Sequence, residues 1–287
     1  MGGVYLKKIG VVVGKNKDTD YKYTGLIVER LLEKGFEVLV TPKVKAGLNL
    51  DATESDSVYQ DSDFIICVGG DGTFLKAARG AFPHKKPVLG VNKGTVGFLA
   101  EVETSEIEMA VERIVAGQYH IQPRVVLNVE VFRNGKCVYT NIAINDAVVS
   151  RSALSRILRL KVLMDDKYVD SFAGDGVIIS TPTGSTGYSL SAGGPIVSPD
   201  MRLLLVSPIC PHILYSRSFI IDETKIITVS LDNNIDVDAI LTLDGQEGFP
   251  IEPDDIVSIS SCPDSVYFAS VKQVNFYDVL RAKIHNT

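Results

Sequence analysis

The chain has 287 residues, of which 45% are hydrophobic and 22% charged, and its formal net charge is −6. This length predicts two domains, or one large domain with an appendage. A negative net charge disfavours nucleic acid as the main partner. Apolar runs are too short to span a membrane, and the N-terminal one is too short and too polar-flanked for a signal peptide. We therefore expect neither a nucleic-acid nor a membrane partner.

The four cysteines lie far apart and form no C-x-x-C pair, and the four histidines show no metal-ligand spacing. Such cysteines are typical of reduced, structural thiols in a cytoplasmic protein. The histidines are more readily explained as core or surface residues than as ligands. The sequence therefore predicts a cytoplasmic location and no metal held by protein side chains alone.

Short, continuously apolar runs alternate with amphipathic stretches in the first third of the chain, which is the pattern of a parallel sheet covered on both faces. The pattern predicts a doubly wound, Rossmann-like α/β domain. Its expected strands are Ile9–Val13, Phe36–Val40, Phe64–Val68 and Pro87–Val91, and its expected helices are Asp20–Lys34, Thr73–Ala81 and Ser105–Ala116.

After Tyr119 the pattern becomes one of short strands separated by Gly, Asp, Asn and Pro clusters, which predicts a β-sandwich-like domain. The expected strands are Val125–Phe132, Leu158–Met164, Val177–Ser180, Ile226–Leu231, Ala239–Leu243 and Ile256–Ser260, with a hairpin turn at Arg133–Lys136. A weakly helical tail, Asn275–Ile284, is expected to pack back on the first domain. The expected domains are residues 1–118 with 270–287, and residues 119–269.

Three glycines surround one aspartate, Asp71, just past the buried run Phe64–Val68. In open α/β sheets ligands bind at the carboxyl ends of the strands, and glycines allow the backbone and the next helix N-terminus to approach an anion. A carboxylate there would repel a phosphate, so it suggests a second task, either holding a cation or taking a proton from a nucleophile. The alternative is that Asp71 only caps the helix expected from Thr73.

Three further stretches favour a ligand site. Gly90–Leu99 is a second glycine-rich exit from the same sheet. Asn145 and Asp146 follow a strand, where an adjacent amide and carboxylate can hold the two hydroxyls of a ribose; an ordinary Asn-Asp turn is the alternative. Gly174–Pro195 is rich in glycine and hydroxyl groups and contains one aromatic residue, Tyr188. With so few apolar side chains it cannot stabilise itself by packing, so we expect it to wrap a polar, planar ligand.

Taken together, GGDGT (Gly69–Thr73), Asn145-Asp146, TPTGSTGYSLSAGGP (Thr181–Pro195) and LDGQ (Leu243–Gln246) resemble the NAD kinase family. The resemblance runs in order over nearly the whole chain. GGDGT alone has relatives in diacylglycerol kinases, sphingosine kinases and phosphofructokinases, whereas the stretch at Thr181–Pro195 is much more specific. The family transfers the γ-phosphate of ATP to the 2′-hydroxyl of the adenosine ribose of NAD, which forms NADP.

The resemblance implies a role for particular residues. Asp71 matches the catalytic base, Gly72 its neighbour at the phosphates, and Phe98 a residue near the adenine. Asn145 and Asp146 match the pair that binds a ribose of the dinucleotide, where many relatives have Glu in the second position. Ala173 departs from relatives that carry a basic side chain there, which bears on how NADP and NADH are treated. The other expected dinucleotide contacts are Arg156, Asp175 (near the nicotinamide), Thr186, Gly187, Tyr188, Ser189, Leu190, Ser191 and Gln246.

The resemblance also implies substrates and partners. ATP and NAD would be the substrates, with Mg²⁺ bound mainly through the ATP phosphates. Bacterial members are usually homo-oligomers whose active sites receive help from a neighbouring subunit, so a homodimer or homotetramer is expected. Two rivals are a lipid kinase of the same superfamily, which would need an apolar slot for acyl chains, and a non-catalytic dinucleotide sensor. The polar loop at Thr181–Pro195 disfavours the first, and the intact Asp71 disfavours the second.

Overall fold

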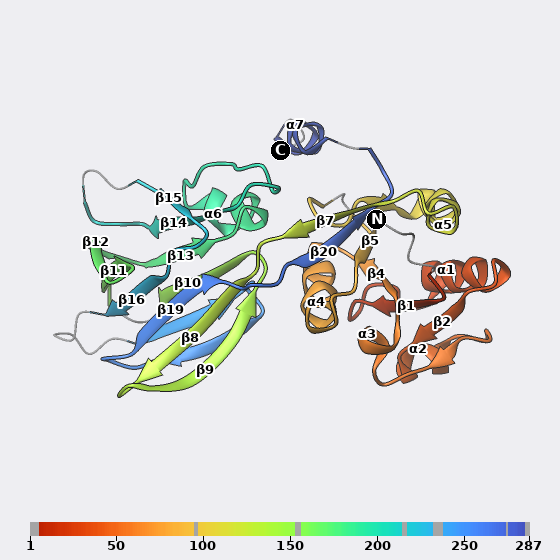
Figure 1. Ribbon diagram of the computed structural model, residues 1–287, viewed down its shortest axis with the longest axis horizontal. Helices are drawn as coiled ribbons and strands as arrows, with labels where there is room; N and C mark the ends of the chain where they lie inside the picture. Colours follow the sequence, from red (N-terminus) through yellow and green to blue (C-terminus); the bar gives the residue numbers. More distant parts are fainter. Residues whose placement is uncertain are drawn as a thin grey trace. The chain divides into compact units, whose positions relative to one another are not determined.

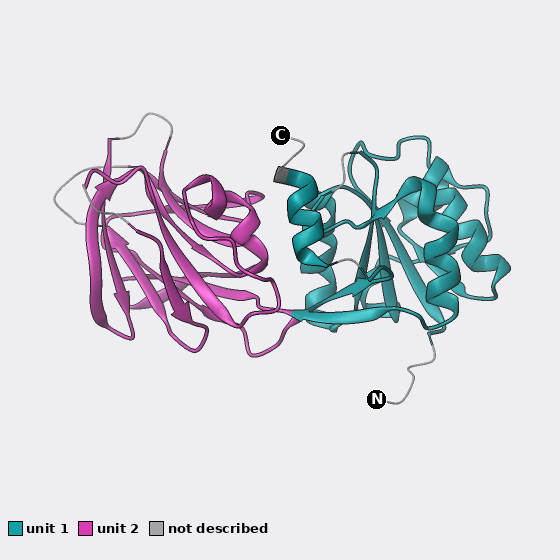
Figure 2. Cartoon of the chain, turned by 90° about the horizontal axis from the view of Figure 1, so that it is seen from above, with its two compact units in different colours: residues 1–123, 266–287 teal, residues 124–265 magenta. Residues whose placement is uncertain are grey.

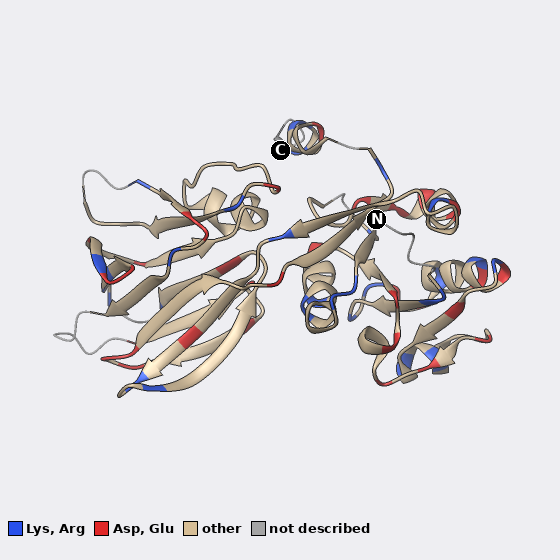
Figure 3. Cartoon of the chain, viewed as in Figure 1, with Lys and Arg blue, Asp and Glu red and all other residues tan. Residues whose placement is uncertain are grey.

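The computed structural model describes residues 6–94, 97–152, 156–213, 217–231, 238–273 and 275–284. The chain divides into two compact units, one formed by residues 1–123 and 266–287 and the other by residues 124–265 (Figure 2). None of the helices in these ranges is long and apolar enough to span a membrane. Lys and Arg are interspersed with Asp and Glu in both units (Figure 3).

The first unit is an α/β domain built on one eight-stranded sheet (Figure 1). The strand order is β3-β2-β1-β4-β5-β20-β7, with β6 beside β5, and the pairings from β3 to β20 are parallel. Its strands are β1 (Lys8–Val13), β2 (Glu37–Val40), β3 (Thr53–Glu54), β4 (Phe64–Gly69), β5 (Val88–Asn92), β6 (Val102–Glu103), β7 (His120–Arg124) and β20 (Val266–Ser270). Its helices are α1 (Lys22–Glu33), α2 (Pro42–Gly47), α3 (Val58–Asp61), α4 (Asp71–Ala81), α5 (Ile107–Val115) and α7 (Phe276–Ile284), with short 3₁₀ turns at Phe82–His84 and Thr104–Glu106.

Both faces of this sheet are buried, which explains why its strands read as unbroken apolar runs. Phe64 and Ile66 on β4 pack into a cluster with residues of α1 and α5. The alternate residues Ile65 and Cys67 are just as buried, at 1% exposure or less. On that second face β1 is so close to α3 that a Cβ on Gly10 would lie 2.8 Å from a methyl of Val58. The predicted doubly wound domain is therefore confirmed.

The second unit is a sandwich of two six-stranded antiparallel sheets. One sheet has the order β15-β14-β13-β10-β17-β18 and the other β12-β11-β16-β19-β8-β9. The strands are β8 (Leu127–Arg133), β9 (Lys136–Ala143), β10 (Asp146–Arg151), β11 (Leu158–Met164), β12 (Lys167–Gly174), β13 (Gly176–Ser180), β14 (Leu203–Ile209), β15 (Phe219–Asp222), β16 (Ile227–Leu231), β17 (Ala239–Leu243), β18 (Glu247–Ile251) and β19 (Ile256–Ser261). A 3₁₀ turn (Thr183–Thr186) and α6 (Tyr188–Ser191) lie between β13 and β14.

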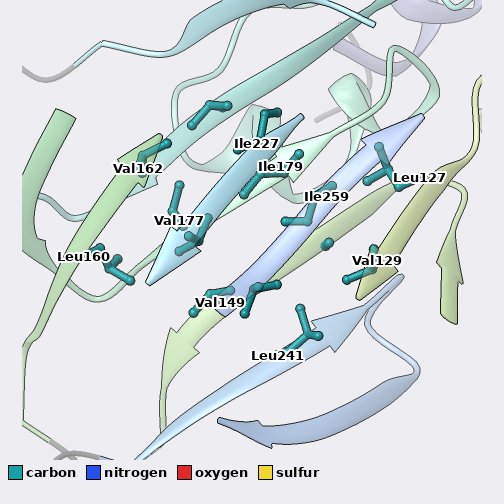
Figure 4. Packing of buried hydrophobic residues seen from close by; sticks show 14 of the residues in the cluster. Leu127, Val129, Val149, Leu160, Val162, Val177, Ile179, Ile227, Leu241 and Ile259 are labelled. Carbon is teal, nitrogen blue, oxygen red and sulfur yellow. The ribbon is translucent and has the colours of Figure 1, made fainter. Parts of the chain in front are cut away.

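Alternating apolar residues from the two sheets interdigitate to form the core of the sandwich (Figure 4). Leu127 and Val129 on β8, for example, are fully buried, while Asn128 between them is not. This is the pattern expected when each strand presents one face to the core. The predicted β-rich domain is confirmed, and the unit has no helix longer than four residues in its described part.

The chain passes between the two compact units twice. The boundaries fall at 123/124 and 265/266, against the expected 118/119 and 269/270. The first boundary lies later in the chain than expected because β7 pairs with β20 at the edge of the first sheet. The sequence of β7, HIQPR, shows no strand pattern. The C-terminal segment belongs to the first unit, where β20 pairs with β5.

Candidate active site

Of the glycines around Asp71, Gly69 is explained by packing, whereas a Cβ on Gly70 would meet nothing within 4 Å. β4 ends at Gly69 and α4 begins at Asp71, two residues earlier than expected. The side chain of Thr73 folds back over the loop, so that a Cβ on Gly69 would lie 2.3 Å from Thr73 Oγ1 and one on Gly14 would lie 2.2 Å from it. Any side chain at these two positions would displace Thr73. These glycines therefore keep the N-terminus of α4 close to the ends of β1 and β4.

The Asp71 carboxylate binds the second glycine-rich stretch. Its Oδ2 accepts the N–H of Phe98 at 2.9 Å, and its Oδ1 accepts those of Leu99 and Ala100, each at 3.2 Å. The N-cap of α4 is Gly70, and no side-chain cap is present. A helix cap does not explain Asp71, because its carboxylate serves a loop 27 to 29 residues further along the chain.

Gly97 is required by the same contact. A Cβ on it would lie 1.8 Å from Asp71 Oδ1 and 2.4 Å from Asp71 Cγ. Residues 95 and 96 of the stretch Gly90–Leu99 lie outside the described residues. Next to Gly97, the Phe98 ring has the ammonium of Lys283, on α7, 5.8 Å from its centre. Gly72 lies exposed in the first turn of α4, next to Asp71.

A charged group that sequence reasoning missed lies at the same edge of the sheet. The N–H of Lys93 donates to Gly69 O at 2.9 Å, and Lys93 Nζ lies 3.5 Å from Oδ1 of the buried Asp18. Asp18 also accepts the N–H and the hydroxyl of Thr24, both at 2.7 Å. Burial raises the pKa of Asp18, but these hydrogen bonds and Lys93 lower it below its usual value overall. Nothing local in the sequence singles out Asp18 among its polar neighbours.

In the second unit the Asn145-Asp146 pair lies at the start of β10. Another aspartate, Asp244, holds the backbone of this pair: its carboxylate accepts the N–H of Ile144 at 3.0 Å, of Asn145 at 2.7 Å and of Asp146 at 3.3 Å. Asp244 has a positive φ of 51° in the turn between β17 and β18. The motif LDGQ pointed to this turn, but the sequence offered no role for its aspartate.

Asp146 is 5% exposed. Burial, together with the negative charge of Asp244, raises the pKa of Asp146 to about 7. Its carboxyl therefore changes charge near neutral pH, whereas an ordinary aspartate is ionised there. An Asn-Asp turn of the usual exposed kind would not have this property.

The stretch Thr181–Pro195 uses many of its hydroxyl groups internally. Thr181 Oγ1 donates to Ile144 O at 2.6 Å, Ser185 Oγ to Pro182 O at 2.7 Å, and Ser189 Oγ lies 3.2 Å from Ser207 Oγ. Buried hydrogen bonds thus take the place of the apolar packing that the stretch lacks, and ligand contact by this stretch stays a prediction. The Ser189 side chain in particular is fully buried.

Two buried polar atoms of this region have no hydrogen-bond partner among the described residues, Asn145 Oδ1 and Thr183 Oγ1. Such atoms are costly unless a ligand or water satisfies them. Gly187 faces the side chains of Asn145 and Asp146, since a Cβ on it would lie 3.7 Å from Asn145 Nδ2 and 3.8 Å from Asp146 Oδ2. The structure thus brings the glycine-serine-threonine loop against Asn145 and Asp146.

Several expected contacts lie on the surface around this pair. Thr186 is half-buried, whereas Tyr188, Leu190, Ser191 and Gln246 are exposed, with Tyr188 at 47%. Gln246 follows the Asp244 turn, and its N–H donates to Leu243 O at 2.9 Å. The loop that contains Thr183, whose hydroxyl is unsatisfied, thus also exposes a tyrosine and a leucine, which suits a ligand with both a flat apolar part and hydroxyl groups.

Of the other expected residues, Asp175 lies at the opposite end of β10 from Asp146. Asp146 pairs with Ser180 at one end of β10, and Ser150 pairs with Gly176 at the other. Asp175 O accepts the N–H of Arg151 at 3.0 Å, five residues and so about 17 Å from Asp146 at 3.4 Å per residue. Asp175 also forms an ion pair with Arg151, at 2.7 Å, which sequence reasoning missed. Ala173 lies on β12 in the other sheet, opposite Arg159, and Arg156 precedes β11. One copy of the chain therefore places Asp175 far from the Asn145-Asp146 pair.

Comparison with known proteins explains why these loops occur together. Residues 9–119 match the model of the ATP-NAD kinase N-terminal domain, and residues 144–271 match that of the ATP-NAD kinase C-terminal domain. The chain belongs to the NAD kinase family. It is 42% identical to the NAD kinase of Acetivibrio thermocellus over 97% of both chains, and 41% identical to that of Caldanaerobacter subterraneus over 97% of this chain and 99% of the relative.

Solved NAD kinase structures share the fold. Yeast NADH kinase complexed with NADH superposes with a TM-score of 0.84 at 23% identity, covering 96% of this chain and 86% of that one. The NAD kinase from Archaeoglobus fulgidus in complex with ATP gives a TM-score of 0.73 at 24% identity, covering 98% of this chain and 99% of that one. These two superpositions show that the chain shares the fold of both proteins.

Proposed function

We propose that this member of the NAD kinase family transfers the γ-phosphate of ATP to the 2′-hydroxyl of the adenosine ribose of NAD, with Asp71 as general base. The observation that carries the dinucleotide site is Asn145, whose side-chain oxygen is buried without a partner next to the carboxyl of Asp146. An amide and a carboxyl that converge in this way match two neighbouring hydroxyl groups of a ribose.

The hydrogen bonds of Asp71 leave room for the role of base. A carboxylate offers about four lone-pair sites, and three of them accept the N–H groups of Phe98, Leu99 and Ala100. The remaining one is suited to the hydroxyl that attacks phosphorus. The three amides fix the orientation of the carboxylate, which is what a reaction dominated by positioning requires.

The ATP phosphates would lie at the N-terminus of α4, where Gly70 and Gly72 keep side chains away and the helix dipole favours an anion. In the described ranges no group of three or more His, Cys, Asp or Glu side chains could hold a metal. The residues fit an Mg²⁺ ion carried mainly by the nucleotide, which is how this ion commonly enters kinase sites. Bound there, it would neutralise charge on the phosphates.

The activity is tested with purified protein, Mg-ATP and NAD, with NADP measured by an NADP-specific dehydrogenase. We expect NADP to form and the reaction to stop when EDTA is added. Turnover of diacylglycerol without turnover of NAD would establish the lipid-kinase alternative. NAD binding without any phosphate transfer would establish the sensor alternative.

We also propose a homodimer or homotetramer in the cytoplasm, where both substrates occur. Support comes from the separation of Asp175 from the Asn145-Asp146 end of β10, because a neighbouring subunit can supply a residue that one copy places too far away. Mixing inactive Asp71→Asn protein with inactive Asp175→Ala protein should restore activity, since some mixed sites receive both intact residues. A monomeric mass by light scattering, or no recovery on mixing, would contradict this assembly.

A further inference from the structure

Asp244, in the LDGQ motif, is heavily hydrogen-bonded near the proposed dinucleotide site, although the sequence offered it no role. Its carboxylate reaches three consecutive backbone N–H groups, those of Ile144, Asn145 and Asp146, at 2.7 to 3.3 Å. In return the Asp244 N–H donates to Asp146 O at 3.0 Å. The two segments are about 100 residues apart in the chain, so the turn and the pair are fixed to each other directly.

We propose that Asp244 is a positioning residue for the dinucleotide: it fixes the backbone of Ile144–Asp146 and, through its negative charge, couples NAD binding to the protonation of Asp146. This inference rests on the proposed function. The inference adds to the proposed function a role for the LDGQ turn in substrate affinity, and it makes that affinity depend on pH.

The first half of the proposal follows from geometry. Asn145 can present its amide to a ligand only if its backbone is held, because its own side-chain oxygen has no hydrogen bond to hold it. Asp244 makes its shortest contact to this residue, at 2.7 Å. On the other side Thr181 N–H donates to Asn145 O at 2.9 Å. The pair is thus clamped between two loops, of which only the Asp244 turn carries a charge.

The second half follows from the surroundings of the Asp146 carboxyl within the second unit. On β13 the neighbour of Asp146 is Ser180, and in the loop that follows β13 its neighbour is Gly187. Neither of these residues ionises. On the β17 side the neighbour is Asp244, whose charge adds to burial in raising the pKa of Asp146 to about 7. A ribose hydroxyl donates more strongly to a carboxylate than to a neutral carboxyl group. NAD should therefore bind more weakly as the pH falls below about 7.

The experiment compares the pH dependence of the KM for NAD in the wild type and in Asp244→Asn. Asparagine keeps the size and tolerates the positive φ of this position, but it removes the charge and replaces one acceptor by a donor. At pH 8, where Asp146 is mostly ionised in both proteins, we expect KM for NAD to rise about tenfold, which corresponds to about 1.4 kcal/mol. Without the Asp244 charge, the pKa of Asp146 should fall, so the rise of KM on acidification should begin at a lower pH than in the wild type.

Asp165→Asn is the matched control. Asp165 also has a positive φ, 47°, and its carboxylate also accepts a backbone N–H, from Ile226 at 3.1 Å, but it lies at the β11–β12 turn. Its KM profile should follow the wild type. A merely structural role for Asp244 would raise KM by the same factor at every pH without moving the profile, and that result would overturn the proposal.

The wild type alone provides a second test, which holds even if Asp244→Asn does not fold. Calorimetric titration with NAD should give a Kd that rises between pH 8 and pH 6, and Asp146→Asn should lose this dependence. A flat wild-type profile would overturn the proposal. If NAD is bound with this profile but no NADP is formed, the proposed catalysis fails while the positioning role stands. If NADP is formed and the profile is flat, the positioning role of Asp244 fails while the proposed catalysis stands.

Discussion

The two units each contain an aspartate that binds three consecutive backbone N–H groups of a distant loop. Asp71 holds Phe98, Leu99 and Ala100, and Asp244 holds Ile144, Asn145 and Asp146. The residues that they hold differ. The loop at Asp71 carries no second carboxyl in its bound segment, so Asp71 itself is the acidic group available to a substrate. The loop at Asp244 includes Asp146, which takes that place.

The same arrangement therefore serves two purposes. In the first unit the clamping carboxylate is the proposed base, and in the second it positions another acid and raises the pKa of that acid to about 7. Carboxylates that accept several backbone N–H groups are strongly oriented. The chemical difference is the number of carboxyl groups at each loop: Asp71 alone in the first unit, and Asp244 together with Asp146 in the second. Four variants separate these two roles of an aspartate.

Asp71→Asn should have the largest effect on rate. The amide cannot take a proton from the hydroxyl, and a general base typically contributes about 10²–10⁴ in rate. We expect kcat to fall at least about a hundredfold, with NAD still bound by calorimetry and the fold intact by circular dichroism. If the variant keeps more than about a tenth of the wild-type kcat, Asp71 acts only as a clamp, as Asp244 does.

Gly97→Ala should act on the same carboxylate without changing its chemistry. The new Cβ would lie 1.8 Å from Asp71 Oδ1, so the carboxylate must shift. Because a misplacement of about 1 Å can cost about a hundredfold in rate, we expect kcat to fall at least about tenfold with little change in KM for NAD. Gly25→Ala, in α1, is the control, because its Cβ would lie 3.4 Å from the nearest atom. Equal kinetics for both variants would show that the site tolerates movement of Asp71.

Asp146→Asn should separate affinity from stability. Loss of the charged acceptor should raise KM for NAD about tenfold, since a hydrogen bond to a charged group is worth about 1.5–3 kcal/mol. Folded Asp146 keeps its proton up to about pH 7, whereas in the unfolded chain its pKa returns to the usual 3.8. Its burial therefore makes the free energy of unfolding fall as the pH rises from about 4 to about 7. We expect the variant to melt higher than the wild type at pH 8, and equal or lower melting there would contradict the raised pKa.

Asp255→Asn should affect stability alone, and with the opposite pH dependence. Burial raises the pKa of Asp255, but the hydrogen bonds from Arg133, at 2.8 Å, and from the Glu252 N–H lower it below the usual value overall. Asp255 thus contributes stability above about pH 4 that is lost on further acidification. We expect Tm at pH 7 to drop by a few degrees with unchanged KM and kcat. A change in KM for NAD would show that the ion pair of Asp255 with Arg133 is also coupled to the dinucleotide site.

Local patterns in the sequence determined much of this protein. The βα alternation, the change to short strands after Tyr119, and the candidates Asp71, Asn145 and Asp146 all follow from residues that are close together in the chain. Apolar periodicity reflects which faces are buried, and clustered glycines reflect close approach of the backbone; both are read within a few residues. Edge elements such as β7 and β15, and short helices such as α2 and α3, were missed because four to six residues carry too little periodicity.

Only the tertiary structure decided what these residues touch. The contacts of Asp71 span 27 to 29 residues and those of Asp244 about 100, and a sequence carries no local sign of a pairing at such distances. The same holds for the burial of Asp146 and for the separation of Asp175 from it along β10. A side chain's charge state depends on the low-dielectric surroundings and on the neighbouring charges that the fold brings to it. The sequence names the acids, and the packing of distant loops decides which one positions and which one reacts.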